Sequence, residues 1–101
     1  MNIEKVVNEN QVVLSVNGRI DTTNANEFAS LVEAEIKDNV ILVLDLKELE
    51  YVSSAGLRVF LSTHKSLVKC GGKLIIRNVN SDVMEVFDIT GFSSILTIEE
   101  N

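Results

Sequence analysis

The spacing of hydrophobic residues changes along the chain, and each spacing predicts a type of element. Two runs rich in β-branched residues, 3–7 and 12–16, flank the polar segment 8–11. Short apolar runs separated by a polar turn predict a β-hairpin, and we place its first strand at the edge of a sheet. We expect Gly18 to end the second strand.

Helices are predicted where apolar residues recur every three or four positions, which puts them on one face. Three segments show this spacing: 21–37, 54–69 and 81–90. Asp21, Thr22, Thr23 and Asn24 could each cap the first helix, and the sequence does not decide between them. A glycine follows each of the other two segments, where left-handed backbone can end a helix.

Three further apolar runs, 39–46, 73–77 and 95–98, predict strands. Residues 40–44 are apolar without interruption, which favours a central strand covered on both faces. The resulting order, β-β-α-β-α-β-α-β, predicts an α/β fold with a mixed, mostly parallel sheet and an antiparallel edge strand. Periodicity leaves the order of the strands in the sheet open.

Composition narrows the possible functions. The 101 residues suffice for one domain spanning 1–101, and the net charge of −6 argues against direct binding to nucleic acid or to an anionic membrane surface. A single Cys excludes an internal disulfide and a multi-Cys zinc site, a single His excludes most His-based metal sites, and we expect no cofactor. No targeting segment or membrane-crossing run is recognisable, so we expect a cytoplasmic protein.

The most suggestive chemistry lies in the segment between the central strand and the second helix, 45–57. Ser53 and Ser54 stand at the predicted helix start, beside the small residues Ala55 and Gly56. A serine there is most simply an N-cap. A phosphate on either hydroxyl would also be tolerated by the free N–H groups of a helix N-terminus. The two interpretations are compatible, because one serine can cap while its neighbour is exposed.

These residues carry a resemblance to a known family. The segments Leu42–Leu46 and Tyr51–Val59 resemble the signature of STAS domains, and specifically that of the bacterial anti-sigma factor antagonists. Segments 16–21, 71–74 and 86–92 resemble further parts of that family, in the same order along the chain. The resemblance therefore implies a STAS-like fold over essentially the whole sequence.

The resemblance also implies a function in partner switching. Such a protein is not an enzyme: its unmodified form binds an anti-sigma factor that is also a serine kinase, and a sigma factor is released. The kinase uses ATP to phosphorylate a serine of the antagonist, which weakens the complex, and a serine phosphatase resets it. The sequence has neither a GxxxxGK(S/T) phosphate loop nor a kinase-type glycine loop, as suits a substrate of phosphoryl transfer.

In the family motif an Asp precedes the phosphoserine, which is followed by Ser or Thr and then Gly-Leu. Counting back from Gly56 puts Ala55 at the Ser/Thr position, Ser54 at the phosphorylated position and Ser53 at the Asp position. Ser53 cannot supply the charge of the family Asp, but its hydroxyl makes it a secondary candidate acceptor. The candidate partner-contact residues are Asp21, Ser53, Ser54, Ala55, Gly56 and Arg58, although Asp21 could simply cap a helix and Arg58 could simply face solvent.

Other functions remain open from the sequence. A phosphoaspartate receiver would use Asp45 near the end of the central strand, but it needs paired acids after the first strand and a longer chain. A STAS protein could also be a subunit of a lipid-transport ABC complex or of a sensory assembly. We expect a monomer, and the sequence does not identify the sigma factor, the kinase or the signal.

Overall fold

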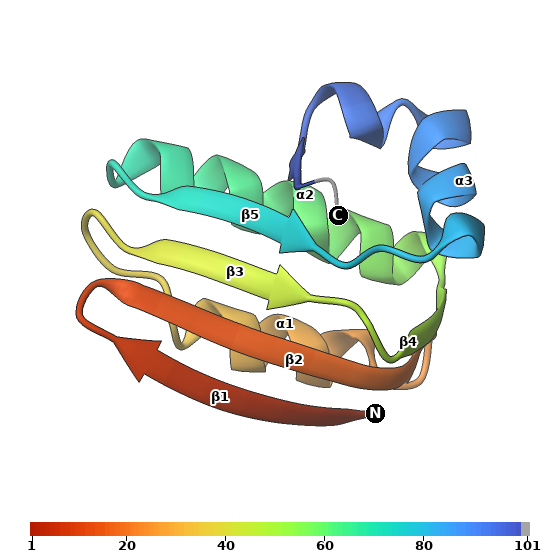
Figure 1. Cartoon of the computed structure of the whole chain (residues 1–101), viewed down its shortest axis with the longest axis horizontal. Coiled ribbons are helices and arrows are strands. Elements are labelled where there is room, and N and C mark those ends of the chain that lie inside the picture. The colour runs from red at the N-terminus through yellow and green to blue at the C-terminus, as the bar shows by residue number, and fades with distance from the viewer. Residues whose placement is uncertain (100–101) are drawn as a thin grey trace.

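The computed structural model describes residues 1–99, and within them six strands form one sheet (Figure 1). The strands are β1 (Asn2–Asn8), β2 (Gln11–Ile20), β3 (Ile41–Asp45), β4 (Leu49–Val52), β5 (Lys73–Arg77) and β6 (Thr97–Ile98). Their spatial order is β1-β2-β3-β5-β6, and β4 pairs with β2 beyond the end of β3. The β1–β2 pair is antiparallel and the others are parallel. The predicted mixed sheet with an antiparallel edge strand is thereby confirmed.

The helices are α1 (Ala25–Glu33), α2 (Ser54–Lys69) and α3 (Ser81–Thr90), and a short 3₁₀ turn, η1 (Phe92–Ser94), follows α3. Helices α1 and α2 lie side by side behind the sheet, whereas α3 lies at the end of the sheet near β4 (Figure 1). Helix α1 is shorter than the predicted 21–37, because turns replace helix at both ends of that segment. No helix among residues 1–99 is long and apolar enough to cross a membrane.

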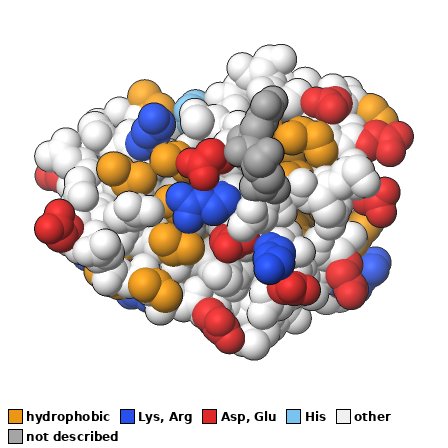
Figure 2. Space-filling model, viewed as in Figure 1, with side chains coloured by type: hydrophobic (Ala, Val, Ile, Leu, Met, Phe, Trp, Pro, Cys, Tyr) orange, Lys and Arg blue, Asp and Glu red, His pale blue; other side chains and the backbone are white. Residues whose placement is uncertain are grey.

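The central strand β3 is buried on both faces, as predicted, because Leu42, Val43 and Leu44 are all fully buried. The described helices, however, cover only one of these faces. Leu42 and Leu44 of β3 belong to the core beneath α1 and α2. Val43 points to the opposite face, where its partners in the sheet are Val13 and Ile75. Figure 2 shows this face, with hydrophobic side chains spread over it and no helix of the described chain across it. Val43 is therefore fully buried on a face that no described helix covers.

Gly18 does not end the second strand as predicted. Strand β2 continues to Ile20, and Gly18 has a φ of 97°, at a shift in the register between β2 and β4. Positive φ suits glycine, so the residue permits a bulge inside the strand. The bulged end of β2 pairs with β4, a strand of four residues inside the segment 45–57, for which the sequence predicts no strand. The final strand, β6, comprises only Thr97 and Ile98, whereas the sequence predicts 95–98.

The core between the sheet and the helices is centred on three phenylalanines, one from each helix. Phe28, Phe60 and Phe87 are fully buried. The ring of Phe60 lies 5.6 Å from each of the other two ring centroids, in edge-to-face geometry. Edge-to-face contact places the positive rim of one ring on the negative face of the next. Phe60 thus joins α2 to both other helices.

We predict that Phe60→Ala lowers the free energy of unfolding by about 3–5 kcal/mol, because it removes buried area and leaves a cavity. The matched control is Ile89→Ala, since Ile89 on α3 is 77% exposed. Urea unfolding of both variants measures the difference. Equal destabilisation by the two substitutions would contradict the central role of Phe60.

Candidate functional site

The candidate residues meet where β2 and β4 end. Ile20 is the partner of Val52 in this parallel pair, and the Ser53 amide donates a hydrogen bond of 2.8 Å to the Ile20 carbonyl. The chain leaves β2 into the turn that contains Asp21 and leaves β4 directly into α2. The pairing therefore brings the Asp21 turn and the first turn of α2 to the same edge of the sheet.

The two serines at the start of α2 have different environments. Ser53 is the N-cap: its side-chain oxygen accepts a hydrogen bond of 3.2 Å from the Gly56 amide, and the residue is 6% exposed. Ser54 is the first helical residue and is exposed. The capping role thus falls to Ser53, while the hydroxyl of Ser54 is on the surface.

Gly56 allows α2 to lie unusually close to the strands beneath it. A Cβ atom at this position would lie 2.7 Å from Cγ2 of Ile20 and 2.8 Å from Cγ2 of Val52. Real Cβ atoms do not approach so closely, so a side chain here would displace the helix start. Gly56 is buried, and Ala55 is half-buried against the core. Of the two, Ala55 retains surface that a partner could touch.

Asp21 organises the turn that precedes α1. Its carboxylate accepts hydrogen bonds from the side chain of Thr23 and from the Thr23 amide, the latter at 2.9 Å. These bonds stabilise the charged form and hold the pKa of the Asp21 carboxyl below its ordinary value, with the Thr23 hydroxyl as the largest cause. The N-cap position of α1 belongs to Asn24, whose side chain instead donates to the Arg19 carbonyl at 2.8 Å.

Arg58 lies one helical turn after Ser54 and is exposed. It lines a shallow hollow of about 300 Å³ between the start of α1 and the first turns of α2. The hollow is lined by Ala25, Asn26, Ala55, Arg58, Val59 and Ser62. Arg58 and Ala55 therefore share one continuous surface beside Ser54.

A second feature of this edge, the stacking of Arg19 on Tyr51, is not evident from the sequence. The guanidinium carbon of Arg19 lies 4.6 Å from the centre of the Tyr51 ring, so the two side chains stack. They are partners in the β2–β4 pair. The sequence carries little signal for this pair, because β4 has four residues and its buried residues, Leu49 and Val52, do not alternate with exposed ones. Recognising β4 would have placed Tyr51 opposite a residue of β2.

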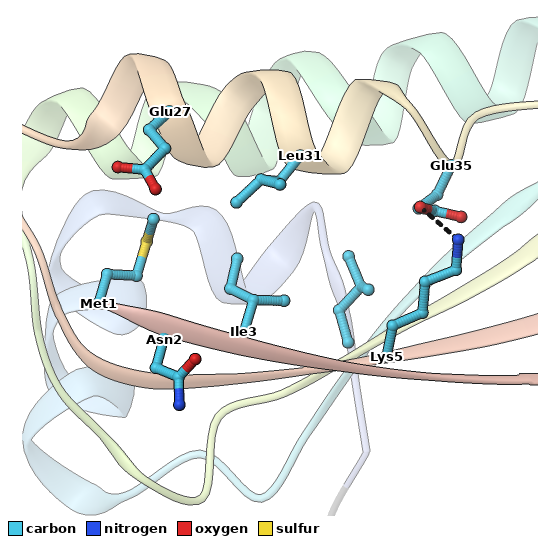
Figure 3. Close-up of a pocket in the computed structure, with 8 residues that line it drawn as sticks. Met1, Asn2, Ile3, Lys5, Glu27, Leu31 and Glu35 are labelled. Carbon is cyan, nitrogen blue, oxygen red and sulfur yellow. Dashed lines mark hydrogen bonds and ion pairs between the residues drawn. The ribbon is translucent and has the colours of Figure 1, made fainter.

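A separate hollow of about 310 Å³ lies between β1 and α1 (Figure 3). Ile3 and Leu31 point toward one another across it, and Lys5 Nζ lies 2.9 Å from Glu35 Oε2 at one end. Glu35 is 8% exposed, so this ion pair compensates a nearly buried carboxylate. The hollow lies on the β1 side of α1, away from the α2 side that carries Arg58.

Comparison with known proteins identifies the fold family. The STAS domain family matches residues 2–101 of the chain. The chain belongs to the STAS domain family. An anti-sigma-B factor antagonist of Bacillus subtilis (strain 168) is 32% identical over 98 residues, which cover 97% of this chain and 90% of the relative. The resemblance of the chain to the STAS domain family is thus confirmed.

Solved structures of anti-sigma factor antagonists share the fold. The crystal structure of an anti-sigma factor antagonist from Mycobacterium paratuberculosis has a TM-score of 0.83 at 22% identity, covering 99% of this chain and 86% of that one. The Bacillus cell fate determinant SpoIIAA in its phosphorylated form has a TM-score of 0.72 at 15% identity, covering 99% and 93%. The unphosphorylated form of SpoIIAA has a TM-score of 0.74.

Asp45, the residue a receiver domain would use, has a structural place in this STAS fold. Its Oδ1 accepts hydrogen bonds of 3.1 Å from the Lys47 amide and from the side-chain amide of Asn78. These bonds tie together the turns that follow β3 and β5. Family membership therefore replaces the receiver alternative.

We predict that the two serines differ in their effect on stability. Ser53→Ala removes the N-cap of α2 and lowers the free energy of unfolding by about 1 kcal/mol. Ser54→Ala changes the free energy of unfolding by less than about 0.5 kcal/mol, because the hydroxyl that it removes is exposed to solvent and does not cap the helix. Chemical denaturation of both variants measures this. A larger loss in Ser54→Ala would show that the cap is misassigned.

We also predict that Thr23→Ala raises the pKa of the Asp21 carboxyl toward its ordinary value of 3.8. Because the folded-state pKa is lowered, the stability that Asp21 contributes is complete above this value and is lost as the pH falls through the folded-state pKa. An NMR titration of the Asp21 carboxyl follows the change. Thr22→Ala serves as the neighbouring control, and an equal rise in both variants would exclude a specific role for Thr23.

Proposed function

We propose that this chain is an anti-sigma factor antagonist that is switched by phosphorylation of Ser54. In this proposal the unphosphorylated form binds an anti-sigma factor that is also a serine kinase, and a sigma factor is thereby released. A serine phosphatase returns the modified protein to its binding form. The observation that carries the proposal is the exposed hydroxyl of Ser54 at the first position of α2, beside the buried cap Ser53.

The named relatives support this function. The Bacillus subtilis relative, which aligns over nearly the whole chain, is an anti-sigma-B factor antagonist. SpoIIAA, which shares the fold, is known in a phosphorylated and an unphosphorylated form. These names favour an antagonist over a subunit of a lipid-transport complex or of a sensory assembly. Co-purification with an ABC-type ATPase in place of a small ATP-binding kinase would reverse that preference.

The two serines differ in how well a kinase could reach them. Phosphoryl transfer requires the attacking oxygen to align with the transferred phosphorus atom. The Ser53 oxygen is occupied by the Gly56 amide and is nearly buried, so its phosphorylation would require the first turn of α2 to open. Ser54 can be reached without opening the helix. The geometry therefore favours Ser54 as the acceptor and leaves Ser53 as the secondary candidate.

Phosphate at Ser54 would act by charge and not by refolding. It adds about 1.5 to 2 negative charges at neutral pH. Ser54 lies outside the core, and the α2 N-terminus tolerates an anion, so the domain would keep its fold. A partner surface that fits the neutral hydroxyl would then face a desolvated charge, and its affinity would fall.

The surface available to the partner comprises the Asp21 turn, Ser54, Ala55 and Arg58. Ser53 and Gly56 would support it from beneath, by capping α2 and by allowing its close approach to the strands. We infer that a single STAS domain spans 1–101. We also infer that it acts as a monomer, because all residues of the candidate surface come from one chain and the surface needs no second copy.

We predict that Ser54→Ala abolishes kinase-dependent phosphorylation. Its affinity for the anti-sigma factor kinase should stay within about twofold of that of the unphosphorylated wild type, since a small side chain is retained. Ser54→Asp should weaken binding by about tenfold or more, because it introduces a charge into the contact area. Calorimetric titration with the purified anti-sigma factor kinase of the same organism, and phosphopeptide mapping, are the measurements.

Phosphopeptide mapping also tests the register of the motif. Label on Ser53 alone would show that the register is wrong. Unchanged affinity in Ser54→Asp, together with unchanged affinity in the phosphorylated wild type, would exclude the charge mechanism. Ser66→Asp, an exposed substitution on α2 remote from the candidate surface, controls for a nonspecific effect of added charge.

A further inference from the structure

Arg58 stands one helical turn after Ser54 on the same helix. Residues four apart on an α-helix are neighbours on its surface, with Cβ atoms about 5–6 Å apart. Both Ser54 and Arg58 are exposed, so their side chains can meet in solvent without disturbing the core. The open hollow between α1 and α2, which Arg58 lines, gives the guanidinium room to change its position.

The charges around Ser54 leave Arg58 available to an anion. The ion pairs found within residues 1–99 join Lys5 to Glu35 and Arg77 to Glu99, and Arg58 belongs to neither. The first turn of α2 contains no acidic residue. The residue before Ser54 is itself a serine, so no carboxylate adjoins the acceptor in sequence to compete for the guanidinium. The carboxylate of Asp21, which lies at the same edge, accepts hydrogen bonds from Thr23, and the cation that helps to lower its pKa is Arg19 and not Arg58.

The other arginine of this edge, Arg19, is held differently. Its guanidinium is stacked on the ring of Tyr51, on the strands β2 and β4. Moving it toward Ser54 would forfeit the cation–π contact. Arg58 has no such stacking contact in the described chain, and it lies on the same helix as the acceptor.

We propose that Arg58 binds the phosphate of phosphorylated Ser54 through an i,i+4 ion pair on α2. This inference rests on the proposed function, since it concerns the regulation of that same site. A guanidinium can offer two parallel N–H donors to two phosphate oxygens. Phosphorylation then changes the docking surface in two ways. It adds an anion at Ser54, and it makes the cation of Arg58 unavailable to the partner.

The pair also affects the phosphate itself. The second ionisation of phosphoserine has a pKa of about 6, and a nearby cation favours the doubly charged form. Binding to Arg58 should therefore lower the pKa of the phosphate and keep it fully charged at mildly acidic pH. Because both groups are exposed, the interaction should weaken as salt is added.

The test places phosphoserine at position 54 during translation, so that no kinase is needed. A ³¹P NMR titration then follows the phosphate in the full chain and in the Arg58→Gln variant. We expect the midpoint of the titration to move to higher pH in Arg58→Gln, and we expect the difference to shrink in about 1 M salt, where the Debye length is about 3 Å. Arg58→Lys should recover part of the shift, because it keeps the charge but loses the fork of donors.

The matched control is Lys65→Gln, which removes the same charge from an exposed position farther along α2. Equal midpoints in wild type, Arg58→Gln and Lys65→Gln would overturn the proposed pair. An equal rise in both variants would show a general charge effect, and it would also overturn the proposal.

The test of the Arg58–phosphate pair can be separated from the test of the proposed function. Calorimetric titration of the unphosphorylated and the phosphoserine-containing proteins with the anti-sigma factor kinase tests the switch itself. Phosphorylation that weakens binding equally in wild type and in Arg58→Gln would leave the switch intact and would contradict the withdrawal of the Arg58 cation. The proposal expects a smaller loss of affinity on phosphorylation in Arg58→Gln than in wild type.

Discussion

The candidate surface depends on the close contact between the first turn of α2 and the paired ends of β2 and β4. Gly56 makes this contact possible, because a Cβ atom there would overlap Ile20 and Val52. The same strands are joined to the helix start by the hydrogen bond from the Ser53 amide to the Ile20 carbonyl. Packing and hydrogen bonding thus hold the start of α2 rigidly against the sheet, and the residues on its outer side are displayed in a fixed position.

The two adjacent serines at the start of α2 have different roles. Ser53 points inward and satisfies an amide that would otherwise lack a partner, whereas Ser54 points outward and carries no part of the fold's packing. This separation would allow a modification of Ser54 to change binding without changing stability. A phosphate on the capping hydroxyl would disturb the helix, while a phosphate on its neighbour changes the surface alone.

The sheet places its functional elements at one end and leaves one face open. Helices α1 and α2 bury the other face, and Phe60 joins α2 to α1 and α3 through edge contacts between rings. The apolar row around Val43 lies on the open face and does not take part in the candidate surface. The candidate surface therefore lies at the end of the sheet beside the two helices, and not on the face that they leave uncovered.

The sequence by itself determined the types of most elements and the mixed sheet, because apolar spacing reports which side of a helix or strand meets a core. It also determined the family, through the residues around Ser53 and Ser54. It did not reveal β4, because four residues with two buried ends give too short a pattern. It correctly indicated burial on both faces of β3, but local apolarity does not say whether a helix or another part of the chain shields a residue.

Tertiary structure alone decided which serine caps α2 and which is exposed. Adjacent serines have the same chemistry. They differ here because the backbone of Ser53 is bonded to Ile20 and its side chain to the Gly56 amide, whereas Ser54 is exposed. It likewise decided that Asp21 lies at the edge occupied by α2, since the two segments are far apart in sequence. Side-chain roles that depend on the contacts of distant segments cannot be read from local pattern, because the fold creates those contacts.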